Sequence, residues 1–222
     1  MKEITLNDIK QNHEVDIYLR RSFEYLRQLG FTEHGLRHAG LIAERSARVM
    51  RELQYTAREQ ELAALAGYMH DIGNMVNRFN HGHASAMLAY NILHGLGMPP
   101  EELAVVIAAI GNHEEEYGHS VNSVAAALIL ADKSDVHRSR VCNEKEVATY
   151  DIHDRVNYAA EESHLHIDLP GRLITLKVKI DQSICPIIEY FEIFLYRMLM
   201  CRRAAGFLRC QFELFINEAN LM

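Results

Sequence analysis

The residues of this chain best suited to chemistry are histidines and aspartates that adjoin apolar stretches. The 222-residue sequence contains 13 histidines, and histidine is the commonest metal ligand in proteins. His70 and Asp71 end the stretch LAALAGYMHD, and Asp132 follows the apolar run VAAALILA. A carboxylate is costly to bury unless a positive charge balances it, and a metal ion supplies that charge. Neutral imidazole beside carboxylate therefore favours a site for Fe, Mn or Zn.

Further histidines lie at inner faces or ends of predicted helices. His38, in GLRHAGLIA, follows His34 by four residues, so the two share a helix face and either could be the ligand. His81 and His83 both lie in NHGHASA, and His113 ends a helix in IGNHEEE. A single histidine on a helix is more often a packing or surface residue. The joint pattern is what indicates a metal site.

Short helices with short connections account for residues 14–138. Apolar residues recur there at helical spacing, and glycines such as Gly30 end several stretches. The pattern predicts helices over 14–29, 33–54, 57–71, 83–96, 101–112 and 121–138, with a loop at 74–82. Such a series indicates an all-α domain.

The chain changes character near residue 140, so we predict a helical domain over 1–140 and an extension over 141–222 packed on it. Apolar and polar residues alternate around Pro170-Gly171, which predicts a β-hairpin over 163–182. Pro186 then opens a long helical run that we extend to residue 219. Its apolar stripe at 187–199 fits either core packing, a cover for the site or a homodimer contact.

Composition excludes several classes of protein. The net charge of -7 argues against a general nucleic-acid binder. The four cysteines have no CxxC spacing and are expected to be free thiols. No apolar run reaches the roughly 18–20 residues of a membrane helix, and the polar start MKEITLNDIKQNHEVD does not resemble a secretory signal. We therefore expect a cytoplasmic protein without a membrane partner.

Three blocks of the sequence, taken in order, resemble the HD-domain metal-dependent phosphohydrolases. That family has a His, a later His-Asp pair and a distant Asp, and the blocks here are GLRHAGLIAERSARVM, LAALAGYMHDIGN and LILADKSD. The likeness covers residues 33–138. It implies an all-α HD-domain helical bundle that binds a metal through His38, His70, Asp71 and Asp132.

The resemblance extends to binuclear members, which insert two further histidines before the final Asp. His83 in HGHASAMLA and His113 in GNHEEE occupy those places. His81 competes with His83, but the spacing of His83 fits the family better. The resemblance thus implies two divalent transition-metal ions (Fe, Mn, Zn, Co or Ni) bridged by Asp71.

The likeness also suggests a substrate class. HDIG resembles the opening of the motif in the cyclic-di-GMP-degrading branch, but Asn74 replaces that branch's Lys and no GYP segment is present. ADKSDVHRSRV is closer to the nucleotide-hydrolysing members. The implied reaction is hydrolysis of a phosphoester or phosphoanhydride in a small molecule, a nucleotide, by metal-activated hydroxide.

Residues near the ligands are candidates for contacting the phosphate. Cationic side chains follow Asp132 closely and bind phosphoryl oxygens well. With Asp71, the predicted catalytic residues are Lys133 and Arg138. Further candidates, for phosphate contact or for orienting a ligand, are Arg140, Asn74, Arg78 and Glu114.

Two other functions fit the same residues. Some HD-fold proteins perform oxygen chemistry at a mixed-valent di-iron site with similar ligands. The chain could also be a non-catalytic, metal-stabilised signalling module. Metal content, oxygen consumption and hydrolysis would separate the three.

Overall fold

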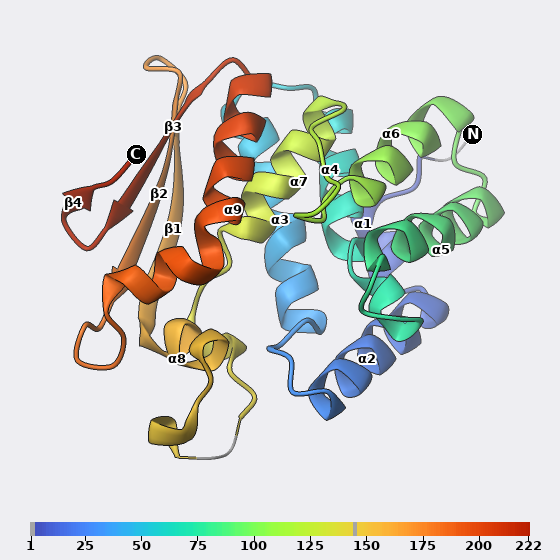
Figure 1. Ribbon diagram of the computed structural model, residues 1–222. Coiled ribbons are helices and arrows are strands. Elements are labelled where there is room, and N and C mark those ends of the chain that lie inside the picture. Colours follow the sequence, from blue (N-terminus) through green and yellow to red (C-terminus); the bar gives the residue numbers. More distant parts are fainter. Residues whose placement is uncertain (1–2, 144–145) are drawn as a thin grey trace.

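The computed structural model of the chain describes residues 3–143 and 146–222, and residues 3–133 form a bundle of helices (Figure 1). The α-helices are α1 (Leu6–Lys10), α2 (His13–Gln28), α3 (Leu36–Glu52), α4 (Ala57–Met69), α5 (His81–Gly95), α6 (Pro100–Gly111) and α7 (Ser123–Lys133). A 3-10 turn, η1 (Ile72–Met75), follows α4, and two more, η2 (Arg138–Arg140) and η3 (Val147–Thr149), follow α7.

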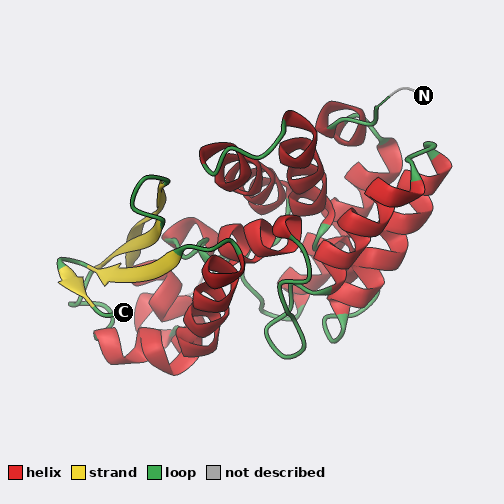
Figure 2. Ribbon diagram, turned by 90° about the horizontal axis from the view of Figure 1, so that it is seen from above, coloured by secondary structure: helices red, strands yellow, loops and turns green. Residues whose placement is uncertain are grey.

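A small sheet and two helices complete the chain. Helix α8 (Ile152–Ala159) leads into strands β1 (Ala160–Asp168) and β2 (Leu173–Ile180), and the long helix α9 (Ile187–Phe207) precedes β3 (Gln211–Ile216) and β4 (Ala219–Asn220). The strand order is β1-β2-β3-β4, with β2 and β3 parallel and the other pairs antiparallel. The sheet lies at one end of the molecule, and α9 packs between it and α7 (Figures 1 and 2).

Local sequence accounts for where several helices begin. Thr56 accepts a hydrogen bond from the backbone of Glu59, whose side chain bonds back to the Thr56 backbone, so α4 starts with a complete capping box. Asn122 caps α7 through its side chain, and Pro100 opens α6. These caps satisfy backbone N–H groups that a helix start leaves without partners.

The centre of the bundle is the packing of α3, α4 and α7. Every residue of α7 from Val124 to Lys133 is buried, as its apolar sequence indicates. Helices α3 and α4 approach very closely at Gly67, where a Cβ would lie 2.8 Å from the carbonyl oxygen of Ile42. Only glycine permits this approach, which brings the last turn of α4 beside His38 of α3.

A second close approach places the start of α5. A Cβ on Gly73 would lie 2.3 Å from the carbonyl oxygen of His81, and the Gly73 N–H donates to Oγ of Ser85 at 2.8 Å. The turn that follows His70-Asp71 is therefore pressed against the first turn of α5.

The C-terminal segment shares its core with the bundle. Apolar residues from both sides of residue 140 belong to one buried cluster. Arg45 and Arg48 of α3 donate to the carbonyl oxygens of Ser163 and Leu165 on β1 at 2.8 and 2.9 Å. In the described part of the chain, no helix combines the length and the apolar character needed to cross a bilayer.

The predicted helices and the hairpin are confirmed, with two errors in length. The helix predicted over 121–138 ends at Lys133, with Ser134 as its C-cap. The helix predicted over 186–219 ends at Phe207, because Leu208 closes it and Arg209 adopts a left-handed φ of 59°. Residues Gln211–Ile216 then alternate exposed and buried positions as a strand. The apolar stripe of α9 is divided, since Phe194 and Met198 are buried whereas Ile188 and Leu195 are exposed.

Candidate metal centre

One cluster joins side chains from α3, the end of α4 and α7. His38 Nε2 lies 3.3 Å from Oδ1 of Asp132 and 3.3 Å from Nε2 of His70. His70 Nε2 in turn lies 3.4 Å from Oδ2 of Asp71. All four side chains are buried. The structure thus brings together the four residues expected to hold the first ion.

A second cluster adjoins the first and comes from the starts and ends of other helices. His81, the first residue of α5, places Nε2 3.2 Å from Oδ1 of Asp71 and 3.1 Å from Nε2 of His113. His113 follows α6, and its Nε2 lies 3.6 Å from the same oxygen. Both histidines are buried.

Asp71 belongs to both clusters through different oxygens. Oδ2 faces His38 and His70, at 3.7 and 3.4 Å, whereas Oδ1 faces His81 and His113. One carboxylate thus contacts both clusters through separate oxygens.

Each of the four imidazoles is held by a hydrogen bond from its Nδ1. Nδ1 of His70, His81 and His113 donates to the carbonyl oxygen three residues earlier, at 2.8, 3.0 and 2.7 Å respectively. Nδ1 of His38 donates instead to Asp135, at 2.7 Å. This leaves each neutral ring with its Nε2 lone pair directed into the cluster, an arrangement typical of metal-binding histidines.

These contacts test whether a cation fits the site. With Nδ1 protonated, His38 and His70 face each other through two lone pairs, and so do His81 and His113. Neither neutral pair can form a hydrogen bond between its two Nε2 atoms. A divalent cation beside these nitrogens and carboxylates would accept the lone pairs that otherwise repel one another, so the donor set fits bound metal.

The electrostatics agree with this fit. Burial would favour neutral carboxyls, but the neighbouring imidazoles in their protonated form, His70 above all, hold the pKa of Asp71 well below its usual value. The charge of Lys133, with protonated His38 and His70, does the same to the pKa of Asp132. Two buried carboxylates therefore remain ionised at neutral pH and require positive charge beside them.

The two histidines of the second cluster differ in their protonation. Burial opposes the charged form of His81, but hydrogen bonds with Asp71 and Glu114 raise its pKa to about 9. Burial lowers the pKa of His113 to about 4. In the absence of a metal, a proton on His81 supplies part of the positive charge that the cluster needs.

Asp135 is a functional residue that the sequence argument missed. It is buried, accepts from His38 Nδ1 and pairs with Arg37 at 2.8 Å, and the charge of Arg140 helps keep its pKa well below the usual range. Its position in LILADKSD, three residues after Asp132, was the available signal. It orients the ring of His38 and raises the basicity of its Nε2.

Replacing Asp135 by Asn should weaken metal binding without removing a ligand. We expect Asp135→Asn to lower affinity at the first site by about 10–100-fold, the usual cost of losing such an orienting partner. Competition against a chelating dye measures this affinity, with Asp16→Asn on the surface of α2 as the matched control. Equal affinities in the two variants would show that Asp135 does not act through His38.

His83 is not brought to the site. His83 is exposed, whereas His81 in the same turn is buried and contacts Asp71. The helix begins at His81, after Asn80 with a left-handed φ of 57°, rather than at residue 83 as expected. Residues two apart on a helix point about 200° apart, so only one of the two histidines can face Asp71.

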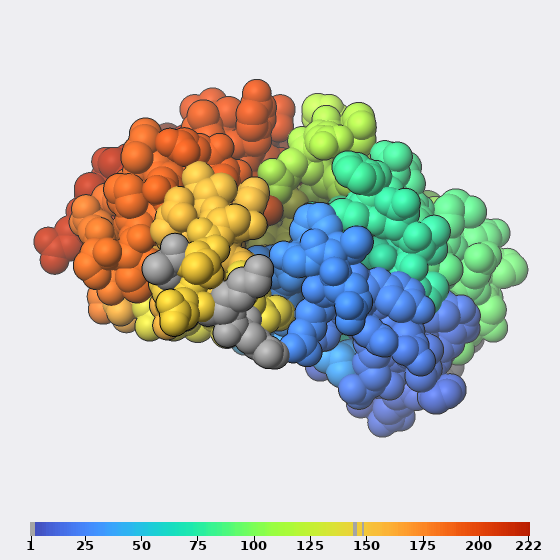
Figure 3. All heavy atoms as spheres, turned by 60° about the horizontal axis from the view of Figure 1, so that its bottom comes forward, coloured from blue at the N-terminus to red at the C-terminus, as the bar shows by residue number. Residues whose placement is uncertain are grey.

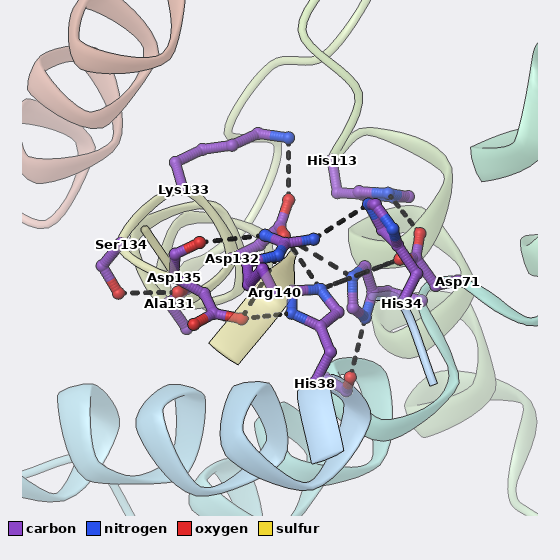
Figure 4. Close-up of polar contacts among 12 residues, drawn as sticks. His34, His38, Asp71, His113, Ala131, Asp132, Lys133, Ser134, Asp135 and Arg140 are labelled. Carbon is purple, nitrogen blue, oxygen red and sulfur yellow. Dashed lines mark hydrogen bonds and ion pairs between the residues drawn. The ribbon is translucent and has the colours of Figure 1, made fainter. Parts of the chain in front are cut away.

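His34 also lies beside the site but has other partners. Its Nδ1 donates to the carbonyl oxygen of Thr32 at 2.6 Å, and its Nε2 accepts from Arg140 at 2.9 Å. Burial, together with the charge of Arg140, holds its pKa well below the usual value. Figure 4 shows Arg140 between His34 and Asp135. His34 therefore positions Arg140, and His38 is the residue in the cluster.

A cavity of about 350 Å³ opens over the clusters. Lys133 lines it, with Nζ 2.7 Å from Oδ2 of Asp132 (Figure 4). Arg138 is not among the lining residues; its guanidinium lies over the ring of Tyr158 and near Glu161. Of the two cationic residues predicted to be catalytic, the structure therefore places Lys133 in the cavity and Arg138 outside it.

Comparison with known proteins agrees with this geometry. The model of the HD domain family matches residues 34–180, about two thirds of the chain. The chain is also 27% identical to the uncharacterized protein MJ1020 of Methanocaldococcus jannaschii, over 66% of this chain. It spans 65% of the length of that relative. The family match covers the helices that supply every residue of the two clusters, and the chain belongs to the HD-domain family.

Proposed function

We propose that this protein is a metal-dependent phosphohydrolase acting on a small phosphorylated molecule, with a nucleotide as the expected substrate. The observation that carries the proposal is the pair of adjoining His/Asp clusters that share the carboxylate of Asp71. HD-domain proteins are typically metal-dependent phosphohydrolases, which agrees with a site of this kind.

The proposed ligands of the first ion are His38, His70, Asp71 and Asp132, and those of the second are His81, His113 and Asp71. Bound at this spacing, the ions would supply a water of lowered pKa and positive charge for the phosphoryl oxygens. His83 and Arg138 have no part in this proposal, because the structure places both outside the cavity.

The side chains of the protein have separate tasks in the reaction. Lys133 lines the cavity beside Asp132, where its ammonium group can contact a phosphoryl oxygen. Glu114 accepts from the Gly82 N–H and lies 3.4 Å from Nδ1 of His81, so it holds that ring in place. The ammonium group of Lys133 and bound metal would already be in place to stabilise the negative charge that develops on the phosphate oxygens.

Aromatic side chains at the cavity support a nucleotide. Phe31, Phe79 and Tyr117 line it and are exposed, with 40%, 79% and 58% of their surface accessible. Exposed rings beside a phosphate site can stack on a base. In Figure 3 the surface is hollowed where the segments carrying these residues meet the segment of α9.

Removing and restoring the metal tests the proposed function. Protein expressed without a His tag is stripped by a chelator and then reloaded with Mn, Fe, Co, Ni or Zn. We expect hydrolysis of phosphoesters and phosphoanhydrides to fall by at least about 100-fold on stripping, since the charge stabilisation that bound metal supplies is worth several kcal/mol, and to return with at least one metal.

Other results would favour the competing functions. Oxygen consumption by the iron-loaded protein, without phosphate release, would indicate the di-iron oxygenase chemistry. Metal binding with neither activity, across nucleotides and simple esters, would indicate a non-catalytic module.

A further inference from the structure

The cavity over the metal centre adjoins a second one. The second cavity has a volume of about 230 Å³ and lies between the loop after α2, helix α8 and helix α9. The two cavities share five lining residues, of which three are arginines: Phe31, His34, Arg78, Arg140 and Arg197. A ligand on the metals can therefore extend past these arginines into the second cavity.

Arg140 is built into the junction. Its side chain is only 3% exposed and donates to the carbonyl oxygens of Asp135 and Glu33 and to His34. Its Nε makes no hydrogen bond within the described residues, but it lies 3.8 Å from Oδ2 of Asp135. Arg140 lines both cavities, so an anionic group at the junction would meet its guanidinium.

Arg78 and Arg197 approach the junction from opposite sides. Arg78 follows η1 and lies 5.4 Å from the ring of Phe31, and no carboxylate of the described residues pairs with it. Arg197 of α9 uses Nε to bind Glu115 at 2.6 Å, which leaves its outer nitrogens for another acceptor. The charge of Arg197 is close enough to help lower the pKa of Arg140, although burial is the larger cause.

Two carboxylates lie at the junction, and each is already paired with one of its arginines. Oδ2 of Asp135 lies 3.8 Å from Nε of Arg140, and Glu115 pairs with Nε of Arg197. Three arginines against these two carboxylates leave the junction positively charged. Across the second cavity lie Asp151, which caps α8, and Asp154 in its first turn. The cationic junction is therefore suited to an anionic group of a ligand. The carboxylates of the second cavity are suited to hydrogen-bond donors of the same ligand.

We propose that the substrate carries a second phosphate group, which Arg78, Arg140 and Arg197 bind at this junction while the scissile phosphate lies over the metals. The organic part then occupies the second cavity, with Phe31 beside it. Guanidinium groups bind phosphate through paired hydrogen bonds, so three of them select a diphosphate over a monophosphate. This inference rests on the phosphohydrolase function proposed above and specifies its substrate class.

Binding of two small probes to the metal-loaded protein tests the proposal. Methylenediphosphonate carries two phosphate-like groups and methylphosphonate carries one, and neither is readily hydrolysed. We expect the diphosphonate to bind at least about 100-fold more tightly, as two further charge-assisted contacts would give. The quantity compared between variants is the ratio of the two dissociation constants, which removes any change common to both probes.

Variants separate the arginines from the metals. Arg78→Gln and Arg197→Gln should each lower the ratio by about tenfold, since each removes one guanidinium–phosphate contact worth roughly 1.5 kcal/mol. Arg202→Gln, at an exposed position of the same helix α9, is the matched control and should change the ratio by less than twofold. Arg140 is left intact because its burial makes loss of folding the expected effect of its substitution.

The outcomes distinguish this inference from the proposed function. A ratio that both variants leave unchanged would show that the metals alone bind the second group, and the inference would be overturned. The same is true if the wild-type ratio is near one. If the ratio behaves as expected but no phosphate is released from any diphosphate ester, the second phosphate site stands and the hydrolytic function falls.

Discussion

Asp71→Asn is expected to lose both metal ions and nearly all hydrolytic activity. Oδ1 and Oδ2 of Asp71 face different His pairs, so this substitution should weaken both clusters at once. The amide keeps the shape of the side chain but has one oxygen and no charge. One ion therefore loses a ligand, and the other exchanges a carboxylate oxygen for a neutral one. Loss of the several kcal/mol that bound metal contributes should lower kcat/KM by about a thousandfold or more.

Elemental analysis of the purified variant, beside a hydrolysis assay, measures both effects. Asp181→Asn, at a turn outside the metal centre, is the matched control and should keep full metal content. His70→Ala should lose the first ion and activity as well. Full metal content and full activity in Asp71→Asn and His70→Ala together would contradict the assignment of the site.

His81→Ala is expected to lower the metal content from about two ions per chain toward one, whereas His83→Ala leaves it unchanged. His81 lies 3.2 Å from Asp71 and 3.1 Å from His113, while His83 is exposed on the other side of the same helix. Losing one of three protein ligands should cost the ion at least the roughly 100-fold in affinity that loss of an orienting partner can cost. The two variants differ by two positions in one helical turn, so each controls for the other.

Metal titration followed by elemental analysis after dialysis gives the stoichiometry of both variants. Loss of an ion from His83→Ala but not from His81→Ala would contradict the orientation of α5, in which His81 faces Asp71. If neither loses one, a single ion bound by His38, His70, Asp71 and Asp132 is sufficient for the protein.

The sequence predicts the helical bundle and the kinds of residue, histidine and aspartate, that form the site at its centre. Apolar periodicity locates the helices to within a few residues, because a helix must bury a continuous stripe. The order of His38, His70-Asp71 and Asp132 along the chain names the first cluster only through the resemblance to the HD-domain family, because helical spacing alone allows His34 in place of His38. These three segments lie on α3, at the end of α4 and on α7, which pack against one another.

Tertiary contacts decide what the sequence leaves open. The choice between His81 and His83 depends on where α5 begins, and that is set by Asn80 and by the contact with Gly73. Asp135 acts only because Arg37 and His38 from α3 reach it across the bundle. Helix α9 ends at Phe207 rather than at residue 219 because the following residues form β3. That strand pairs with β2, which is distant in the sequence.

Closure of the sheet at both edges bears on how this protein behaves at high concentration. A strand with free N–H and C=O groups invites a strand from another molecule, and aggregation follows. Here Arg45 and Arg48 occupy the outer carbonyl oxygens of β1 at Ser163 and Leu165. On the opposite side, the short β4 and the last residues of the chain cover β3, with Leu221 donating to Leu214 at 2.8 Å. The four-stranded sheet therefore offers little template for intermolecular β-pairing.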